Sequence, residues 1–185
     1  SLMYGGEPII DLLNLPDFEF VKGDVRNEAD VRKAMEGIDC VAHLAAIVGD
    51  PACAQNPELA KTTNIEGSEM LYKIANEMGA SKFVFASTCS NYGKMDDPNQ
   101  FVTEESTLAP VSLYAETKVA VEQFLLSQPQ SNNCKPTCLR FSTVYGLSLR
   151  PRFGLTVNEF AKELALGREL VIFGGQFWRP YCHVD

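Results

Sequence analysis

Short apolar runs alternate with longer stretches of helical pattern along most of this 185-residue chain. The runs of strand type are Phe18–Val21, Cys40–Ala45, Phe83–Ala86, Thr137–Phe141, Leu170–Phe173 and Tyr181–Val184. The expected helices are Glu28–Met35, Glu58–Met78, Ser112–Leu126 and Val157–Leu166. A loop with Gly49, Asp50 and Pro51 is expected after Cys40–Ala45, and a polar loop over Asp96–Pro110. Strands separated by helices of this length predict right-handed βαβ units and a parallel, Rossmann-like sheet flanked by helices.

The composition excludes several classes of protein. Apolar residues make up 45% and charged residues 22%, which is ordinary for a globular protein with a core. The net charge of −8 argues against a nucleic-acid partner, and no apolar run has the roughly 20 residues of a membrane span. The six cysteines contain no Cys-x-x-Cys pair, and only two histidines are present. We therefore expect no metal site, no disulfide framework and a reducing, cytoplasmic location.

Polar residues follow the expected strands. In open parallel sheets, ligands bind beyond the carboxyl ends of the strands. The segments in that position are Asp24, Ala45–Asp50, Ser87–Tyr92 and Ser142–Gly146. Ser87–Tyr92 contains a cluster of hydroxyl groups and is followed by Gly93. A rigid strand end could present these hydroxyl groups to a ligand.

Tyr114 and Lys118 form a candidate acid–base pair. They lie four residues apart in the helical pattern that follows Ser112, an expected N-cap, so they share one face of the helix. A phenol with a reference pKa of roughly 10 is a poor base near neutrality. A nearby ammonium favours the phenolate and turns the tyrosine into a usable proton acceptor.

Together these features resemble the extended short-chain dehydrogenase/reductase family, in its NAD-dependent nucleotide-sugar epimerase/dehydratase branch. The resemblance rests on an ordered set of motifs that runs through nearly the whole chain. In chain order they are Gly23-Asp24-Val25-Arg26, His43-Leu44-Ala45-Ala46, Pro57, Asn64-Ile65-Glu66-Gly67, Ser87-Thr88 through Tyr92-Gly93, Tyr114 with Lys118, Leu139–Gly146 and Arg179–Asp185.

The resemblance implies a role for each matching residue. The implied catalytic residues are Thr88, Tyr114 and Lys118, with Tyr114 as the general base. The implied cofactor-binding residues are Asp24, Val25, Leu44, Ala45, Ala46, Ser87, Tyr114 and Lys118, and the implied substrate-binding residues are Thr88, Thr143 and Arg179. Asn64 is expected to buttress the site rather than to touch substrate.

The implied activity is that of a nucleotide-sugar epimerase or a related reductase that uses NAD or NADP. Tyr114 as phenolate would take a proton from a sugar hydroxyl while hydride passes to the nicotinamide. Dehydratases of this branch carry an Asp-Glu pair after the Thr, where this chain has Cys89 and Ser90, so a 4,6-dehydratase is disfavoured. A homodimer is a candidate assembly.

The chain departs from the family pattern at its start. Residues 1–185 contain no Gly-x-x-Gly-x-x-Gly turn, whose helix N-terminus would hold the cofactor pyrophosphate. We expect an incomplete dinucleotide-binding domain over residues 1–146, without the first βαβ unit, and the start of a substrate-binding region over 147–185. The two should form one compact unit, and residues 1–185 alone should bind NAD weakly.

Two other functions stay open at this level. One is an interaction module that keeps the fold without catalysis, which the absence of the glycine turn favours. The other is a reductase or dehydrogenase for a steroid or flavonoid-like substrate. Residues 135–185 hold 7 basic and 4 acidic side chains, and this basic tail with Arg179 favours a nucleotide-linked substrate instead.

Overall fold

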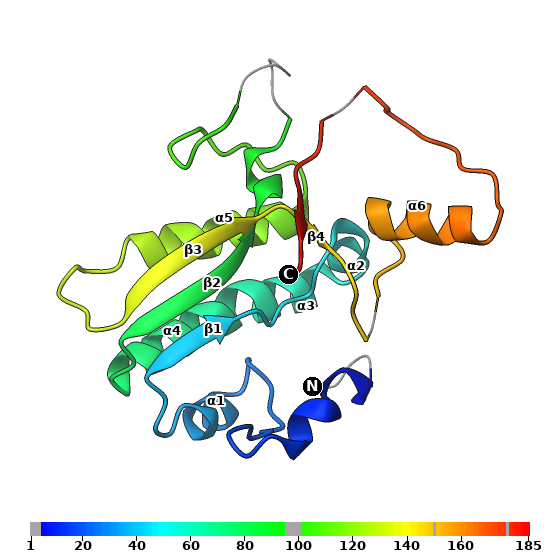
Figure 1. Cartoon of the computed structure of the whole chain (residues 1–185). Coiled ribbons are helices and arrows are strands. Elements are labelled where there is room, and N and C mark those ends of the chain that lie inside the picture. Colours follow the sequence, from blue (N-terminus) through cyan, green and yellow to red (C-terminus); the bar gives the residue numbers. More distant parts are fainter. Residues whose placement is uncertain (1–4, 95–100, 150, 177) are drawn as a thin grey trace. The chain divides into compact units, whose positions relative to one another are not determined.

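A three-stranded sheet in the order β1-β2-β3 is the larger sheet among the described residues of a computed structural model (Figure 1). The structure describes residues 5–94, 101–149, 151–176 and 178–185. The strands are β1 (Cys40–His43), β2 (Lys82–Thr88) and β3 (Lys135–Phe141). β1 and β2 pair in parallel, with Cys40 opposite Lys82 and His43 opposite Phe85. The predicted Rossmann-like parallel sheet flanked by helices is therefore confirmed.

The chain divides into two compact units. The larger one comprises Val21–Arg140, and the smaller one combines Ser1–Phe20 with Phe141–Asp185. The sequence-based boundary at residue 146 between a cofactor domain and a substrate region stays a prediction.

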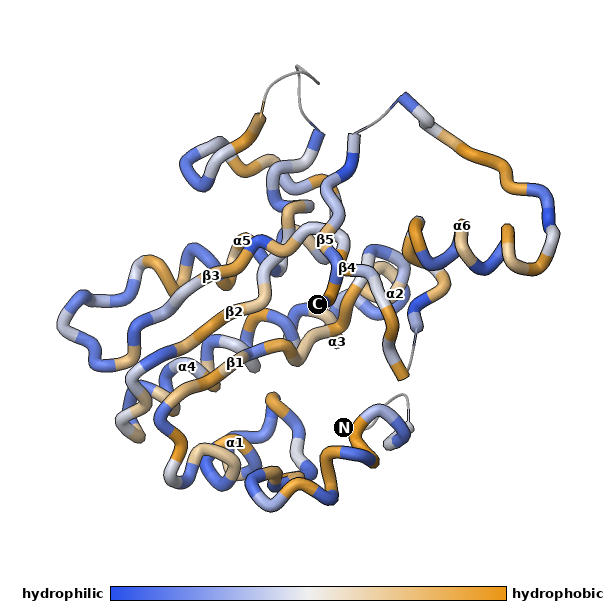
Figure 2. Tube along the Cα trace, in the orientation of Figure 1, coloured by the Kyte–Doolittle hydropathy of each residue, from blue (hydrophilic) through white to orange (hydrophobic). Residues whose placement is uncertain are grey.

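The helices of the larger unit cover one face of the sheet. They are α1 (Glu28–Ala34), α2 (Asp50–Gln55), α3 (Pro57–Lys61), α4 (Gly67–Glu77) and α5 (Leu113–Leu126), with a π-helix η3 (Thr62–Glu66) and a 3-10 turn η4 (Cys89–Tyr92). Figure 1 shows α4 and α5 side by side behind the strands. Figure 2 shows β1 and β2 as mostly hydrophobic segments.

The core lies between this face of the sheet and the helices. Alternate residues of β2 point into it, and Phe83 and Phe85 are fully buried there. The Tyr72 ring of α4 meets the Phe83 ring edge-on at 5.4 Å. Its hydroxyl donates to the Cys134 carbonyl at 3.0 Å, so the buried phenol is satisfied. Burial of a large side chain of this kind stabilises the fold by about 2 kcal/mol.

The helix expected over Glu58–Met78 is broken into three pieces. α3 and α4 have ordinary helical geometry, but η3 between them is a π-helix. A π-turn inserts extra backbone into a helix and often marks a functional site. The predicted end is correct, because Gly79 has a φ of +88° and the Ala80 N–H donates to the Ala75 carbonyl.

Three other expectations are wrong. Phe18–Val21 and Leu170–Phe173 are not strands, because no described strand pairs with either and an unpaired strand leaves its backbone groups without partners. The segment from Asp50 is a helix instead of a loop, with Pro51 in its first turn. The expected loop is present over residues 101–110, while Asp96–Gln100 lie outside the described residues.

The smaller unit contains a two-stranded parallel sheet of β4 (Thr143–Tyr145) and β5 (Tyr181–His183). Its helix α6 covers Thr156–Ala165, and two 3-10 turns, η1 (Glu7–Ile9) and η2 (Asp11–Asn14), lie near the start of the chain. At Gly146, with a φ of +136°, an added Cβ would lie 2.6 Å from Val184, so only glycine fits beside β5.

Within the described part of the chain, no helix is both long and apolar enough to cross a membrane. All six cysteines are free thiols.

Candidate active site

Tyr114 and Lys118 lie on one face of α5, as their spacing predicts. Ser112 begins the helix, and its hydroxyl accepts the N–H of Ala115 at 3.3 Å, which confirms the predicted N-cap. Tyr114 is in the first turn and half-buried, and the Lys118 Nζ lies 5.9 Å from the centre of its ring. The ammonium and the phenol are therefore neighbours.

Lys118 is a buried cation at the carboxyl end of β2. Its side chain is only 3% exposed, and Nζ donates to the Ala86 carbonyl at 2.8 Å. The same nitrogen lies 4.5 Å from the centre of the Phe85 ring. Burial lowers the pKa of Lys118 from 10.5 to about 8. The bond to Ala86 uses one of the three N–H groups of the ammonium.

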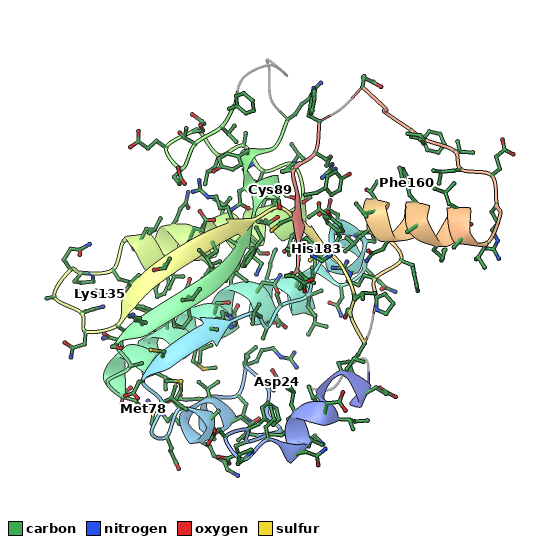
Figure 3. The ribbon with its side chains drawn as sticks, in the orientation of Figure 1. Asp24, Met78, Cys89, Lys135, Phe160 and His183 are labelled. Carbon is green, nitrogen blue, oxygen red and sulfur yellow. The ribbon has the colours of Figure 1, made fainter. Side chains whose placement is uncertain are left out.

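Thr88 is the last residue of β2 and the N-cap of η4. Its hydroxyl oxygen accepts the N–H of Ser90 at 3.2 Å, and the residue is 8% exposed. Alternation along the strand turns Thr88 and Ser87 to opposite sides. Figure 3 labels the next residue, Cys89, at the end of β2. Thr88 thus lies two residues after Ala86, whose carbonyl accepts from Lys118, and its hydroxyl is held by the backbone of η4.

Ser87 is engaged by a buried cluster that the sequence did not reveal. Its hydroxyl donates to Glu122 Oε1 and accepts the side-chain amide of Asn91 at 3.0 Å. Arg140 Nη2 donates to Glu122 Oε2 at 2.7 Å. The predicted cofactor contact of Ser87 stays a prediction, and its hydroxyl group is held by the protein. The signal for this cluster in the sequence is the i, i+4 repeat of Tyr114, Lys118 and Glu122.

Asn64 buttresses the site from the π-helix. Its side-chain amide accepts the N–H of Ile47 at 2.8 Å and donates to the Ile47 carbonyl at 3.0 Å. It also donates to the Thr117 hydroxyl at 3.1 Å, which in turn donates to the Tyr114 carbonyl at 2.8 Å. One buried amide therefore ties the loop after β1 to the first turn of α5.

Gly67, the last residue of the Asn64-Ile65-Glu66-Gly67 motif, is needed because the backbone of another segment lies close to it. A Cβ at this position would lie 3.2 Å from both the carbonyl oxygen and a methyl group of Val25. The glycine lets the segment of Asp24 and Val25 lie close against α4. Asn64 thus binds the loop after β1, and Gly67 leaves room for the segment of Asp24 and Val25, so both expected cofactor segments lie against one helical stretch.

The expected cofactor residues of these two segments are accessible to a ligand. Leu44 and Ala45 are exposed and Ala46 is half-buried, in the loop after β1. Asp24 lies in the loop before α1 (Figure 3), where Arg26 Nη2 donates to its carboxylate at 2.6 Å. The hydrogen bonds from Arg26 lower the pKa of Asp24 to about 2. Asp24 is therefore an anion held by Arg26, and its contact with adenine stays a prediction.

Thr143 and Arg179 are neighbours in the smaller unit. The Thr143 N–H donates to the carbonyl of Pro180 at 3.2 Å, next to Arg179 in the chain. Arg179 is exposed and Thr143 is half-buried. The structure thus brings together two residues that the sequence assigned to substrate, from positions 36 apart.

His43 is a buried imidazole beside the site. Its Nε2 lies 2.8 Å from the Ser68 hydroxyl, which donates its own hydrogen to the Asn64 carbonyl at 2.6 Å. Nε2 must therefore carry the hydrogen, which fixes the tautomer of the neutral ring. Burial, and secondarily the charge of Lys118, lower the pKa of His43 from 6.5 to about 4.

Because His43 is buried, we expect the stability of the fold to fall at acidic pH. The folded state binds the proton more weakly than the unfolded state, so stability is complete above pH 6.5 and falls as the pH drops towards 4. The loss through His43 is about 3 kcal/mol. His43→Gln keeps an N–H donor for Ser68 but does not titrate. Denaturant unfolding between pH 7 and 4 should show a shallower loss in this variant, and equal slopes would contradict the prediction.

The model of the NAD dependent epimerase/dehydratase family matches residues 7–185. The chain belongs to this family. It is 34% identical over 179 residues to an uncharacterized UDP-glucose epimerase of Bacillus subtilis (strain 168), a match that covers 95% of the chain and 54% of the relative. A 3-beta-hydroxysteroid dehydrogenase of Mycolicibacterium neoaurum is 32% identical over 136 residues, or 71% of the chain and 37% of that protein.

Solved structures of this family have the same fold. The UDP-glucuronic acid 4-epimerase from Bacillus cereus, in complex with UDP-glucuronic acid and NAD, superimposes with a TM-score of 0.82 at 28% identity. The match covers 96% of the chain and 55% of that enzyme. The chain spans about half the length of the relatives it matches. The resemblance to the extended short-chain dehydrogenase/reductase family is thus confirmed.

Proposed function

We propose that this chain carries the catalytic centre of an NAD(P)-dependent nucleotide-sugar epimerase or a related reductase. The observation that carries the proposal is the Lys118 ammonium, buried at the end of β2 and next to the Tyr114 ring. A buried lysine with a lowered pKa and a specific aromatic neighbour is typical of a functional site. The membership of an enzyme family of this kind supports the same conclusion.

The residues of the larger unit fit the nicotinamide half of a dinucleotide. Lys118 can donate to ribose hydroxyls, and the exposed loop of Leu44–Ala46 offers backbone groups at the carboxyl end of β1. NAD, which the B. cereus enzyme binds, would supply a hydride acceptor for the reacting carbon. NADP stays open, because no described residue here decides between them.

Three side chains would handle the sugar hydroxyl. Tyr114 takes its proton as phenolate, and the charge of Lys118 nearby favours that form. Thr88 orients the hydroxyl from the end of β2. Proton transfer to a positioned base of this kind contributes about 10²–10⁴-fold to the rate. Arg179 and Thr143 of the smaller unit are proposed to bind the substrate.

An epimerase or reductase fits the chain better than a dehydratase. Elimination of water needs a second acid next to Thr88, and Cys89 and Ser90 occupy those positions. The Ser90 N–H is bound to Thr88 itself. Thiols and hydroxyls as classes are weaker acids than carboxyl groups, so they are poorer proton donors to a leaving hydroxide. A homodimer and a cytoplasmic location remain predictions.

Residues 1–185 alone should bind NAD weakly. They contain no glycine turn for the pyrophosphate, which is a principal anion-binding element of dinucleotide sites. Calorimetric titration of purified 1–185 should give a dissociation constant well above the micromolar range. Micromolar binding would contradict this prediction.

The test of the proposed function is an assay of the protein encoded by the complete reading frame that contains this chain. It is incubated with NAD or NADP and a panel of UDP- and GDP-sugars, and the products are separated by stereochemistry. Interconversion of C4 epimers without net consumption of cofactor is the expected result. Net reduction of cofactor with a keto product identifies a dehydrogenase, and no change in any sugar contradicts the proposal.

A steroid dehydrogenase is the second candidate, favoured by the relative from M. neoaurum. Including a 3-beta-hydroxysteroid in the same panel separates the two. A third candidate, a binding module without catalysis, predicts no product with any substrate. The buried Lys118 argues against this third candidate, because a cation kept at 3% exposure costs stability and needs a function to retain it.

A further inference from the structure

Glu122 is a buried carboxylate that holds four segments of the larger unit together. It is 1% exposed and lies on α5, one turn after Lys118. Its oxygens accept from Ser87 at the end of β2 and from Asn91 in η4, the latter at 2.8 Å. Arg140 of β3 donates to Oε2 through Nε at 3.0 Å and through Nη2 at 2.7 Å.

Arg140 extends this cluster to the loop that leads into Tyr114. Its Nη1 donates to the Tyr92 hydroxyl at 2.9 Å and to the Glu104 carbonyl at 3.0 Å. The same loop is held at a second point, where the Ala109 N–H donates to the Asn91 carbonyl at 3.0 Å. Gly93, with a φ of +68°, is required there, because an added Cβ would lie 1.8 Å from the Ala109 carbonyl oxygen.

The cluster and the catalytic residues share the same contacts between α5 and β2. Lys118 binds the carbonyl of Ala86, and one turn later Glu122 binds the hydroxyl of Ser87. Thr88 follows directly. Two successive side chains of one helical stripe therefore attach to two successive residues of the strand, which sets the position of Tyr114 relative to Thr88.

Stability alone does not account for such a cluster. A buried ion pair is often no more stabilising than apolar residues of the same volume, because both charges must be desolvated. The Asn91 side-chain oxygen is buried and has no hydrogen-bond partner among the described residues. Such a group costs about 1–3 kcal/mol. The arrangement fixes a geometry at the expense of stability.

We propose that Glu122 and Arg140 are positioning residues that hold Tyr114, Lys118 and Thr88 in catalytic register. The inference rests on the proposed function of these three residues. It predicts that loss of the pair slows the chemical step while the substrate still binds, because neither residue is needed to contact the sugar.

The test uses Glu122→Gln with Arg140→Met, which removes both charges but keeps an amide oxygen as acceptor for Ser87 and Asn91. In the protein from the complete reading frame, kcat should fall by about 10–100-fold, because a misplacement of about 1 Å can cost 100-fold, and KM should change less than about 3-fold. In residues 1–185, NMR titration of labelled lysines should show a raised Lys118 pKa, because burial lowers this pKa and a displaced ammonium is less buried. The Lys118 signal is assigned by comparison with Lys118→Met.

The matched control is Arg32→Met with Glu77→Gln. This pair carries the same two substitutions, joins α1 to α4 through a bond of 2.9 Å between Arg32 Nη2 and Glu77 Oε2, and is exposed. It should leave kcat, KM and the Lys118 titration unchanged. Arg140→Lys, which keeps the charge but not the two-pronged contact, replaces the double variant if that one fails to fold, and should lower kcat in the same direction.

A folded variant with wild-type kcat, KM and Lys118 titration overturns the inference and leaves a purely structural pair. If the wild type acts on no nucleotide sugar, the proposed function fails. In that case the NMR titration alone tests whether Glu122 and Arg140 position Lys118. A Lys118 titration that is the same in the wild type and in the double variant contradicts the inference.

Discussion

Tyr114→Phe should lower kcat by about 10²–10⁴-fold with little change in KM. The substitution removes only the hydroxyl, so the ring keeps its place near Lys118, where Nζ lies 5.9 Å from the ring centre. Without the phenol, no oxygen of residue 114 can take the proton of the sugar hydroxyl. Initial rates on the preferred nucleotide sugar, with protein from the complete reading frame, measure the effect.

Tyr72→Phe is the matched control for this substitution. Its buried hydroxyl donates to the carbonyl of Cys134, the residue before β3, and has no role in the proposed chemistry. This variant should lose about 1 kcal/mol of stability and keep its kcat. Unchanged turnover in Tyr114→Phe would show that another group is the base.

Lys118→Met should abolish most activity without loss of stability at neutral pH. The folded state lowers the pKa of Lys118 from 10.5 to about 8, so it binds the proton more weakly than the unfolded chain. The wild type therefore gains stability as the pH rises from 8 to 10.5, by about 3 kcal/mol through this one group. Below pH 8 the buried charge opposes folding.

The methionine variant avoids this cost, although it leaves the Ala86 carbonyl without the ammonium donor. We expect its free energy of unfolding at pH 7 to equal or exceed that of the wild type, and its rise between pH 8 and 10.5 to be absent. kcat should fall at least about 100-fold, since the phenolate loses its stabilising charge. Urea unfolding across pH and initial rates measure both.

Lys73→Met provides the comparison for Lys118→Met. Lys73 is exposed on α4, where it lies 3.6 Å from Glu69 and 5.2 Å from the centre of the Phe124 ring. This variant should keep the rise in stability at alkaline pH and the full kcat. A wild type whose stability does not rise between pH 8 and 10.5 would contradict the burial of a charged Lys118.

The sequence was a good guide where a local pattern decides the structure. The Ser112 N-cap, the stripe of Tyr114 and Lys118 and the stop at Gly79 depend on residues within one or two helical turns. The sequence was a poor guide where the local structure involves a segment far away in the chain. Phe18–Val21 has strand composition but no described partner strand, and the Asn64 side chain in the π-turn binds the loop after β1.

The sequence by itself determined the family, the sheet-and-helix architecture and the candidate acid–base pair of Tyr114 and Lys118, because these follow from periodicity and ordered motifs. Only the tertiary structure decided that the Lys118 ammonium is buried against Ala86, that Ser87 is held by Glu122, and that Glu122 pairs with Arg140. These contacts join residues 18 to 35 positions apart. Their energies depend on burial and on exact distances, and no local pattern in a chain specifies either.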